Sequence, residues 1–281
     1  MGLVINTNIA AINASRILRR STLALNKSLE RLSSGLRINR AADDAAGLAI
    51  AEGLSSQVRG LRVAQRNAQD GISLVQTAEG ALSEVSNMLQ RMRELAVQAA
   101  NGTLTIANRV DINGEFQQLK DQINDTVRRV EFNGITPLNS NAAITLQTGA
   151  NAGQTTNVIG GDNFSTTGGT GTPRLSGINS SILTGPDATN PTAAIGALDT
   201  AIGVINTARA GLGATQNRLE FTINTLAIQE ENSAAGESAI RDANIALETI
   251  AFTRNQILVT AGTAVLAQAN LVPQTALQLL G

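Results

Sequence analysis

The chain has 281 residues and a formal net charge of −1, and only 2% of its residues are aromatic. It contains no Trp, Tyr, Cys or His, which excludes disulfides, thiol nucleophiles, Cys/His zinc sites and imidazole acid–base chemistry. A compact enzyme of this length usually buries several aromatic rings around its pocket. The composition therefore favours closely packed helices over a thick globular core.

Residues 3 to 35 are predicted to form the first helix, which ends at a Ser-Ser-Gly breaker. Residues 1 to 42 carry seven basic residues and one acidic residue. A nucleic-acid-binding arm is one interpretation, but the basic residues have no aromatic partners for base stacking and interleave with an apolar row. A charged flank beside a helix seam explains them better, so no nucleic acid is expected as a partner. The row consists of Val4, Ala11, Leu18, Leu25 and Leu32.

Neither a secretory signal nor a membrane span is predicted. The first twenty residues place their positive charges after the apolar residues, which reverses the order of a signal peptide. The most apolar stretch, Ile257 to Val272, is interrupted by polar residues and is shorter than the roughly 20 apolar residues that a span needs. A packing helix explains that stretch better, and no membrane is expected as a partner.

A long helix is predicted to open at Asp43 and Asp44. Paired carboxylates are compatible with acid–base or metal chemistry, but at a helix start they more often satisfy free N–H groups and the helix dipole. The apolar residues that follow recur about every 3.5 residues, which is the coiled-coil period, and the helix would be roughly 65 to 70 Å long. The row consists of Leu54, Val58, Leu61, Ala64, Ala68, Ile72, Val75, Ala78, Leu82, Val85, Leu89, Met92, Ala96 and Ala99.

A break at Asn101-Gly102-Thr103 precedes a second helix, which is predicted over 106–129. From Asn139 to Thr192 the chain is rich in Ser, Thr, Asn and Gly. Residues 143 to 160 are predicted to form a β-hairpin that turns at 150–153, and 161–192 an exposed variable loop. The glycine run at 168–171 is not a phosphate loop, because Pro173 and Arg174 follow where a Lys-Ser/Thr and a helix are needed.

Helical periodicity resumes near Thr192, continues to Leu226, weakens over 229–236 and returns over 240–279. The first helix is predicted to lie against 240–279, and the longer inner helices to form a separate bundle. The fold class is thus mainly α: a long antiparallel helical bundle or coiled coil with a small β-hairpin and a Ser/Thr/Gly/Asn-rich loop. The inner row is Leu198, Ile202, Ile205, Ala208, Leu212, Thr215, Leu219, Ile223 and Leu226.

The terminal helix pair is too thin to bury a core alone, so we expect neighbouring copies to cover it. This expectation implies a polymer. The predicted self-assembly residues of the two terminal helices are Ile5, Ile9, Ile12, Leu18, Leu25, Leu29, Leu32, Leu247, Ile250, Ile257, Leu266 and Leu271.

The N-terminal stretch that begins LVINTNIAAINASRILRRSTLALNKSLERLSSGLRINRAADDAAGLAI resembles the bacterial flagellins, and so does AIRDANIALETIAFTRNQILVTAGTAVLAQANLVPQTALQLL near the C-terminus. The resemblance implies a short flagellin, which is a structural subunit and not an enzyme. It implies flagellar type III export, polymerisation into an extracellular filament, and an export chaperone, cap and hook-junction proteins as partners. Residues 1–42 with 239–281 would form the inner tube, and 43–238 the outer tube.

The resemblance also implies contacts with host sensors. Flagellins are recognised by a Toll-like receptor through a motif matched here by Leu89, Gln90, Arg91, Glu94 and Leu95, with an acidic residue that corresponds to Glu115. Inflammasome sensors read a C-terminal motif matched by Leu277, Leu279 and Leu280. The chain ends in Gly281 where the family frequently has Arg.

Two alternatives remain open at the level of sequence. A hook-filament junction protein has similar helical ends, although its middle region is usually more elaborate. An enzyme is disfavoured, because no nucleophile and base pair is evident. No cofactor or metal is expected, and the zinc-protease motif of some flagellins is excluded because the chain has no His.

Overall fold

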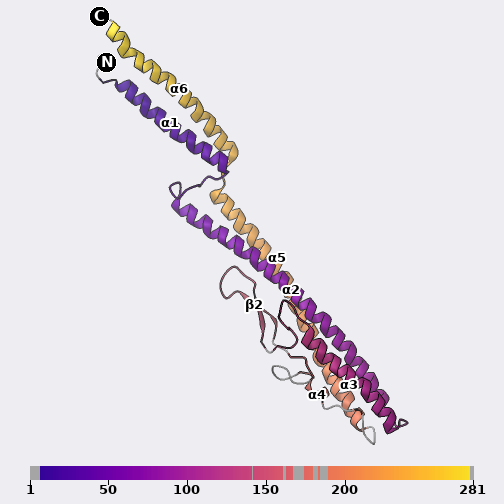
Figure 1. Ribbon diagram of the computed structural model, residues 1–281. Helices are drawn as coiled ribbons and strands as arrows, with labels where there is room; N and C mark the ends of the chain where they lie inside the picture. Colours follow the sequence, from indigo (N-terminus) through magenta and orange to yellow (C-terminus); the bar gives the residue numbers. More distant parts are fainter. Residues whose placement is uncertain are drawn as a thin grey trace. The chain divides into compact units, whose positions relative to one another are not determined.

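The computed structural model describes residues 7–140, 142–160, 163–166, 174–179, 183 and 189–278, with the backbone alone at 179, 189 and 272–278. The chain divides into two compact units, a terminal unit of Met1–Ser56 with Asn232–Gly281 and a central unit of Gln57–Glu231. The mainly α fold class is confirmed (Figure 1). The described elements are α1 (Ile9–Ser34), α2 (Ala45–Ala99), α3 (Ile106–Arg129), β1 (Ile144–Gln147), β2 (Thr155–Ile159), α4 (Ser176–Asn179), α5 (Thr189–Arg241) and α6 (Ile245–Gln278).

In the terminal unit α1 and α6 lie side by side, as the sequence predicts (Figure 1). Asn8 caps the start of α1, where its Oδ1 accepts a hydrogen bond from the N–H of Ala11 at 3.0 Å. The helix ends at the expected breaker, because Gly35 adopts a left-handed conformation with φ of 73° and donates its N–H to the carbonyl of Arg31.

The two carboxylates before α2 serve as a helix cap and an ion pair. Asp44 accepts a hydrogen bond from the N–H of Gly47 at 2.9 Å, which satisfies a free donor in the first turn of α2. Asp43 pairs with the Lys27 ammonium at 2.7 Å, and this hydrogen bond is the main reason that the pKa of Asp43 lies below its ordinary value. The capping interpretation is confirmed for Asp44.

In the central unit α2 and α5 share one hydrophobic core, as their matching periods predict. Every predicted row member of α2 from Val58 to Ala99 is buried, and so are Leu198, Ile205 and Leu219 of α5. Three ion pairs tie the helices in antiparallel order: Arg62–Glu230 at 2.6 Å, Arg209–Glu79 at 3.0 Å and Arg93–Asp199 at 2.6 Å. The helix α3 has the predicted bounds and buries Phe116, Ile123 and Val127 in the same core.

The predicted hairpin is confirmed and consists of the antiparallel strands β1 and β2. It packs on α2 of the central unit, where Asn67 Nδ2 donates to the carbonyl of Gln147 at 3.0 Å. A side chain at Gly71 would collide with Leu146, so the glycine permits the hairpin to approach the helix closely.

The prediction that 161–192 is an exposed loop is wrong for several of the residues that the structure describes there. Phe164, Leu175, Ile178 and Leu183 are at most 2% exposed and belong to the core of the central unit. Asn124 of α3 fastens this segment, because its Oδ1 accepts from both the N–H and the hydroxyl of Thr166 at 2.8 and 3.0 Å. These four apolar side chains anchor a segment that is otherwise polar.

The apolar pattern weakens over 229–236 as noted, yet α5 continues without interruption to Arg241. This stretch is rich in Gln, Glu and Ala, whose helix propensity keeps the backbone helical without an apolar row. The break comes later, and α6 begins at Ile245 and not at 240. Asn244 caps α6 by accepting from the N–H of Leu247 at 3.2 Å.

Candidate assembly surface

Small side chains fill the seam that α1 presents to α6. The buried residues of α1 are Ala14, Ser21 and Ser28, which are spaced by seven residues. Leu18, Leu25 and Leu32 of the predicted row alternate with them and are half-buried. Small residues allow the two helices to approach closely, but they bury little apolar area.

The large apolar side chains of α6 lie on another face of the helix. We define the α6 apolar face as Leu247, Ile250, Ile257, Leu258, Val265 and Leu271, which are 47–66% exposed. Its residues form a strip along one side of the helix, whereas the half-buried Asn255, Val259 and Gly262 mark the side toward α1. Of the self-assembly residues predicted on this helix, Leu247, Ile250, Ile257 and Leu271 therefore face solvent, whereas Leu266 is half-buried.

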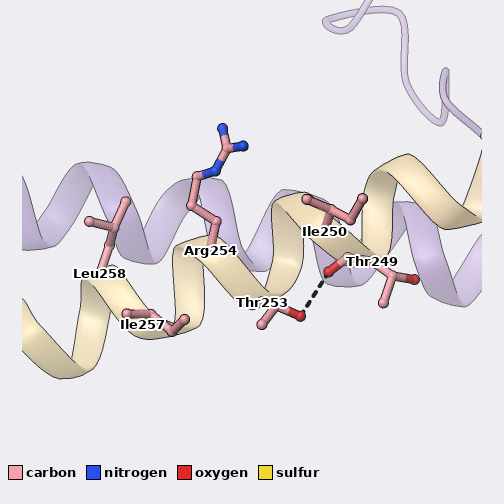
Figure 2. A pocket seen from close by; sticks show the side chains of 6 residues that line it. All are labelled: Thr249, Ile250, Thr253, Arg254, Ile257 and Leu258. Carbon is pink, nitrogen blue, oxygen red and sulfur yellow. Dashed lines mark hydrogen bonds between the residues drawn. The ribbon is translucent and has the colours of Figure 1, made fainter.

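Figure 2 shows the middle of this strip, where Ile250, Ile257 and Leu258 line a shallow groove of about 420 Å³. The hydroxyl of Thr253 donates to the carbonyl of Thr249 at 2.9 Å, so its polar group is satisfied within the helix. The side chain of Arg254 extends away from the helix (Figure 2). The groove is thus an apolar surface beside one cation.

Large apolar side chains of α1 are exposed as well. We define the α1 apolar face as Ile9, Ile12, Ile17 and Leu23, which are 54–72% exposed. Several exposed large apolar side chains on one helix often mark a contact with another molecule. The terminal unit thus carries exposed large apolar side chains on both of its paired helices.

The predicted self-assembly residues divide into two groups. Leu18, Leu25, Leu32 and Leu266 are half-buried within the helix pair. Ile5 lies outside the described residues. The exposed group consists of Ile9, Ile12, Leu29, Leu247, Ile250, Ile257 and Leu271.

Charged groups hold the base of the helix pair together. Arg31 of α1 pairs with Glu248 of α6 at 3.5 Å, and Arg241 pairs with Glu52 at 3.3 Å. The connections after α1 and before α6 form one antiparallel bridge between Leu36 and Asp242. Arg31 therefore lies on a charged flank beside the seam, as the sequence predicts for its basic residues.

Some residues of the predicted receptor motif lie in the core of the central unit, and the others lie on its surface. Leu89 and Leu95 are at most 2% exposed and pack in the core of the central unit. Arg91 is exposed and bridges two carboxylates, because its Nε donates to Glu115 at 2.9 Å and its Nη1 to Glu94 at 3.0 Å. The hydrogen bond to Glu115 is the main reason that the pKa of Arg91 lies above its ordinary value, and the hydrogen bond to Glu94 raises it further.

Gln90 is exposed beside this triad. The structure thus brings Gln90, Arg91, Glu94 and Glu115 together on one surface, while the two leucines are not accessible. The predicted C-terminal motif is not described in the same detail. Leu277 lies on the last turn of α6 with its side chain undescribed, and Leu279 and Leu280 lie outside the described residues.

The residues that the structure describes contain no group of three or more Asp or Glu side chains placed to hold a metal ion. Among the described helices, none combines the length and the hydropathy needed to cross a membrane.

Comparison with known proteins covers nearly the whole chain. Residues 5–143 match the bacterial flagellin N-terminal helical region, and residues 195–280 match the bacterial flagellin C-terminal helical region. The chain is 46% identical to a flagellin of Halalkalibacterium halodurans, over 99% of this chain and 100% of that protein. It is also 46% identical to a flagellin of Bacillus subtilis, over 98% and 99% of the two chains.

A putative flagellar hook-associated protein from Vibrio parahaemolyticus has a similar structure, with a TM-score of 0.60 over 71% of this chain and 100% of that one. Its identity of 16% shows a shared fold alone. The flagellin matches extend over the full length at much higher identity, and nothing favours the hook-junction alternative. The chain is therefore a structural subunit of the bacterial flagellar filament and belongs to the bacterial flagellin family.

Proposed function

We propose that copies of this chain polymerise by burying the α1 and α6 apolar faces of the terminal unit against other copies. The observation that carries the proposal is that Ala14, Ser21 and Ser28 are buried in the seam of the helix pair, while the ten large apolar side chains of the α1 and α6 apolar faces are exposed to solvent. Such a pair gains most of its apolar burial only when another molecule covers it.

The magnitude of this burial fits assembly at high subunit density. Covering half-exposed side chains contributes about 1 kcal/mol each, so ten of them give roughly 10 kcal/mol per copy. Association itself costs on the order of 4 to 15 kcal/mol in lost translational and rotational freedom. The gain from burying these faces and the cost of association are comparable. The terminal faces therefore favour a filament, because each copy in a filament has several neighbours that can cover them.

The resemblance to flagellins supports a division of labour between the two parts of the chain. Residues 1–42 and 239–281 would form the inner tube, and 43–238 the outer tube. Subunits would leave the cell by flagellar type III export and add to an extracellular filament beneath a cap. An export chaperone and the hook-junction proteins would be the other partners of the chain.

The exposed triad of the central unit supports recognition by a Toll-like receptor. Arg91 presents a planar guanidinium between Glu94 and Glu115, which is a geometry suited to charge-assisted recognition. Direct contact would then come from the triad and Gln90, while Leu89 and Leu95 would act by holding α2 in the core. Inflammasome recognition through Leu277, Leu279 and Leu280 is a separate proposal that rests on the family motif.

Electron microscopy of the purified chain tests the polymerisation. The wild type should form long filaments, and Ile250→Glu with Ile257→Glu should raise the critical concentration at least about tenfold, because the buried contact would then include two carboxylates. Gln256→Glu on α6 is the matched control and should assemble normally. Filaments of the double variant at the wild-type critical concentration would contradict the proposal.

A further inference from the structure

The chain contains three Asn-Gly pairs, and the structure places each of them in a different local environment. They are Asn101-Gly102, Asn113-Gly114 and Asn133-Gly134, and all of them lie in the central unit. An asparagine side chain reacts with the main chain most readily when glycine follows, because glycine has no side chain to block the approach of its nitrogen. The local structure therefore determines which of the three pairs reacts.

The reaction is a spontaneous deamidation that needs no partner other than water. The main-chain nitrogen of the glycine forms a bond to Cγ of the asparagine and loses its proton, and the side-chain nitrogen leaves as ammonia. Water then opens the resulting five-membered imide at either carbonyl and leaves an aspartate or an isoaspartate. The imide ring contains the Cα–C bond of the asparagine, so this bond must rotate before the ring closes. A segment that must first open to permit this rotation reacts slowly.

The pair Asn113-Gly114 is held by a helix and by two side-chain hydrogen bonds. Both residues lie inside α3, where the N–H of Gly114 is part of the helix ladder. Asn113 Oδ1 accepts from the N–H of Leu183 at 3.1 Å and from Gln117 Nε2 at 3.4 Å. Rotation of the Asn113 backbone would break the helix and release the N–H of the buried Leu183.

The pair Asn133-Gly134 forms a tight turn that two hydrogen bonds close. Both residues have a positive φ, of 50° and 80°. Phe132 and Ile135 exchange N–H to carbonyl hydrogen bonds across the turn at 2.9 and 3.0 Å. These are the features of the two-residue turn for which Asn-Gly is a preferred sequence. Rotation at Asn133 would break both bonds, so the turn keeps the ring from closing.

The pair Asn101-Gly102 lies in the exposed connection between α2 and α3, outside both helices. The N–H of Thr103 donates to Asn101 Oδ1 at 3.1 Å. Negative charge develops on this oxygen when the Gly102 nitrogen attacks Cγ, so the N–H is placed to stabilise the intermediate. The Asn101 carbonyl accepts from the N–H of Leu104 at 3.2 Å and from Arg109 Nη2 at 3.3 Å. Water can replace both bonds at this exposed residue without the loss of a helix or a strand.

We propose that Asn101 is a site of spontaneous deamidation, whereas the fold protects Asn113 and Asn133. The product carries one more carboxylate, so the formal net charge of a modified copy changes from −1 to −2. A polymer of this chain would gain one negative charge per modified copy as it ages. The chemistry does not depend on polymerisation, so failure of this proposal and failure of the proposed function are separate results.

Mass spectrometry of the aged full-length chain measures all three sites in one digest, because trypsin places them on the separate peptides 94–109, 110–120 and 130–174. In mildly alkaline buffer Asn101 should gain one mass unit at least about tenfold faster than Asn113 and Asn133, whose segments must first open. The same incubation in denaturant is the control, and it should bring the three rates within about threefold of one another. A folded chain in which Asn113 or Asn133 reacts as fast as Asn101, or in which Asn101 reacts only in denaturant, would overturn the proposal.

A glycine substitution tests the attacking nitrogen independently. Gly102→Ala adds a Cβ that meets no atom within 4 Å, and the φ of Gly102 is not positive, so the variant should fold normally. The added methyl group should slow the reaction at Asn101 at least about tenfold, because it hinders the approach of the nitrogen to Cγ. Gly80→Ala on α2 also meets no atom within 4 Å and is the matched control, with an unchanged rate expected. A rate at Asn101 that Gly102→Ala leaves unchanged would overturn the imide route and with it the proposal.

Discussion

The seam between α2 and α5 closes over large side chains such as Leu82 and Leu198, whereas the seam between α1 and α6 closes over Ala14, Ser21 and Ser28. Both pairs follow a coiled-coil period, so the period alone does not set where the apolar area goes. In the central unit the chain covers its own apolar rows. In the terminal unit the α1 row of Leu18, Leu25 and Leu32 is half-buried in the seam. The α1 and α6 apolar faces remain open to solvent and are available to other copies.

This difference has a thermodynamic consequence. Stability that comes from burial within one copy does not depend on protein concentration, whereas stability gained on binding other copies does. We therefore expect the central unit to hold its fold at high dilution and the terminal unit to gain most of its stability on assembly. The following predictions separate the two units by this criterion.

The largest effect should come from deleting residues 242–281, which removes α6 and its apolar face. Filament growth should cease, because α1 then loses its partner and the strip that other copies would bury is gone. Circular dichroism should still show a helical chain, and brief proteolysis of either chain in dilute solution should leave a fragment near 43–238. Filaments of normal length from the truncated chain would refute the assembly role of α6.

Truncating a buried Leu of the central unit should destabilise the monomer. Truncating an exposed Ile of α6 should leave the monomer stable and impair assembly instead. Leu82→Ala removes a fully buried side chain of the central core and should lower the free energy of unfolding of the monomer by about 2 to 5 kcal/mol. Ile257→Ala removes a side chain that is 62% exposed and should cost less than about 0.5 kcal/mol.

Denaturant unfolding at high dilution and the critical concentration for assembly measure the two sides of this comparison. Ile257→Ala should impair assembly in spite of its small effect on the monomer. Equal losses of monomer stability in the two variants would show that Ile257 is already buried in the isolated chain.

Arg91→Ala should have little effect on folding and a larger one on receptor recognition. Its two ion pairs are exposed, and pairs of this kind contribute little to stability. A central interface arginine can contribute about 2 kcal/mol or more to binding, so signalling by the monomer should fall at least about tenfold. Reporter cells treated with equal concentrations measure the effect, and unchanged potency with an unchanged fold would leave the triad a purely structural role.

The smallest effect concerns the ion pair between Lys27 and Asp43. The pKa of Asp43 is lowered chiefly by the hydrogen bond from Lys27, so its contribution to stability is present above the ordinary carboxyl pKa and is lost as the pH falls through the lowered value. Lys27→Gln should move the pKa of Asp43 upward. An NMR titration of the Asp43 carboxyl carbon measures the shift, and an unchanged pKa would mean that the pair does not form in solution.

The sequence predicts the central seam well, because residues such as Leu61, Leu82 and Leu89 recur at one period and are all buried. It predicts the pairing of α1 with α6 but not which side of α6 faces α1. A period identifies the residues that share a face, and Ile250 and Ile257 do share one. What covers that face depends on the partner helix and on other copies, which a single helical pattern does not encode.

The buried segment after the hairpin could not be predicted in the same way. Phe164, Leu175, Ile178 and Leu183 follow no helical or strand period, so only their apolar character in a polar stretch indicates burial. The triad of Arg91, Glu94 and Glu115 depends on the packing of α3 against α2, which brings together residues 24 positions apart. Resemblance to a family motif identified these residues, and packing geometry explains how they meet.

Hydrogen exchange on monomer and filament tests most directly whether other copies cover the terminal unit. Amides of α6 over 245–271 should exchange readily in the dilute monomer and become at least about a hundredfold more protected in the filament, whereas amides of α2 over 72–99 should be well protected in both. Mass spectrometry of peptides from the two regions gives both values in one experiment. Protection of α6 in the dilute monomer equal to that in the filament would contradict the account.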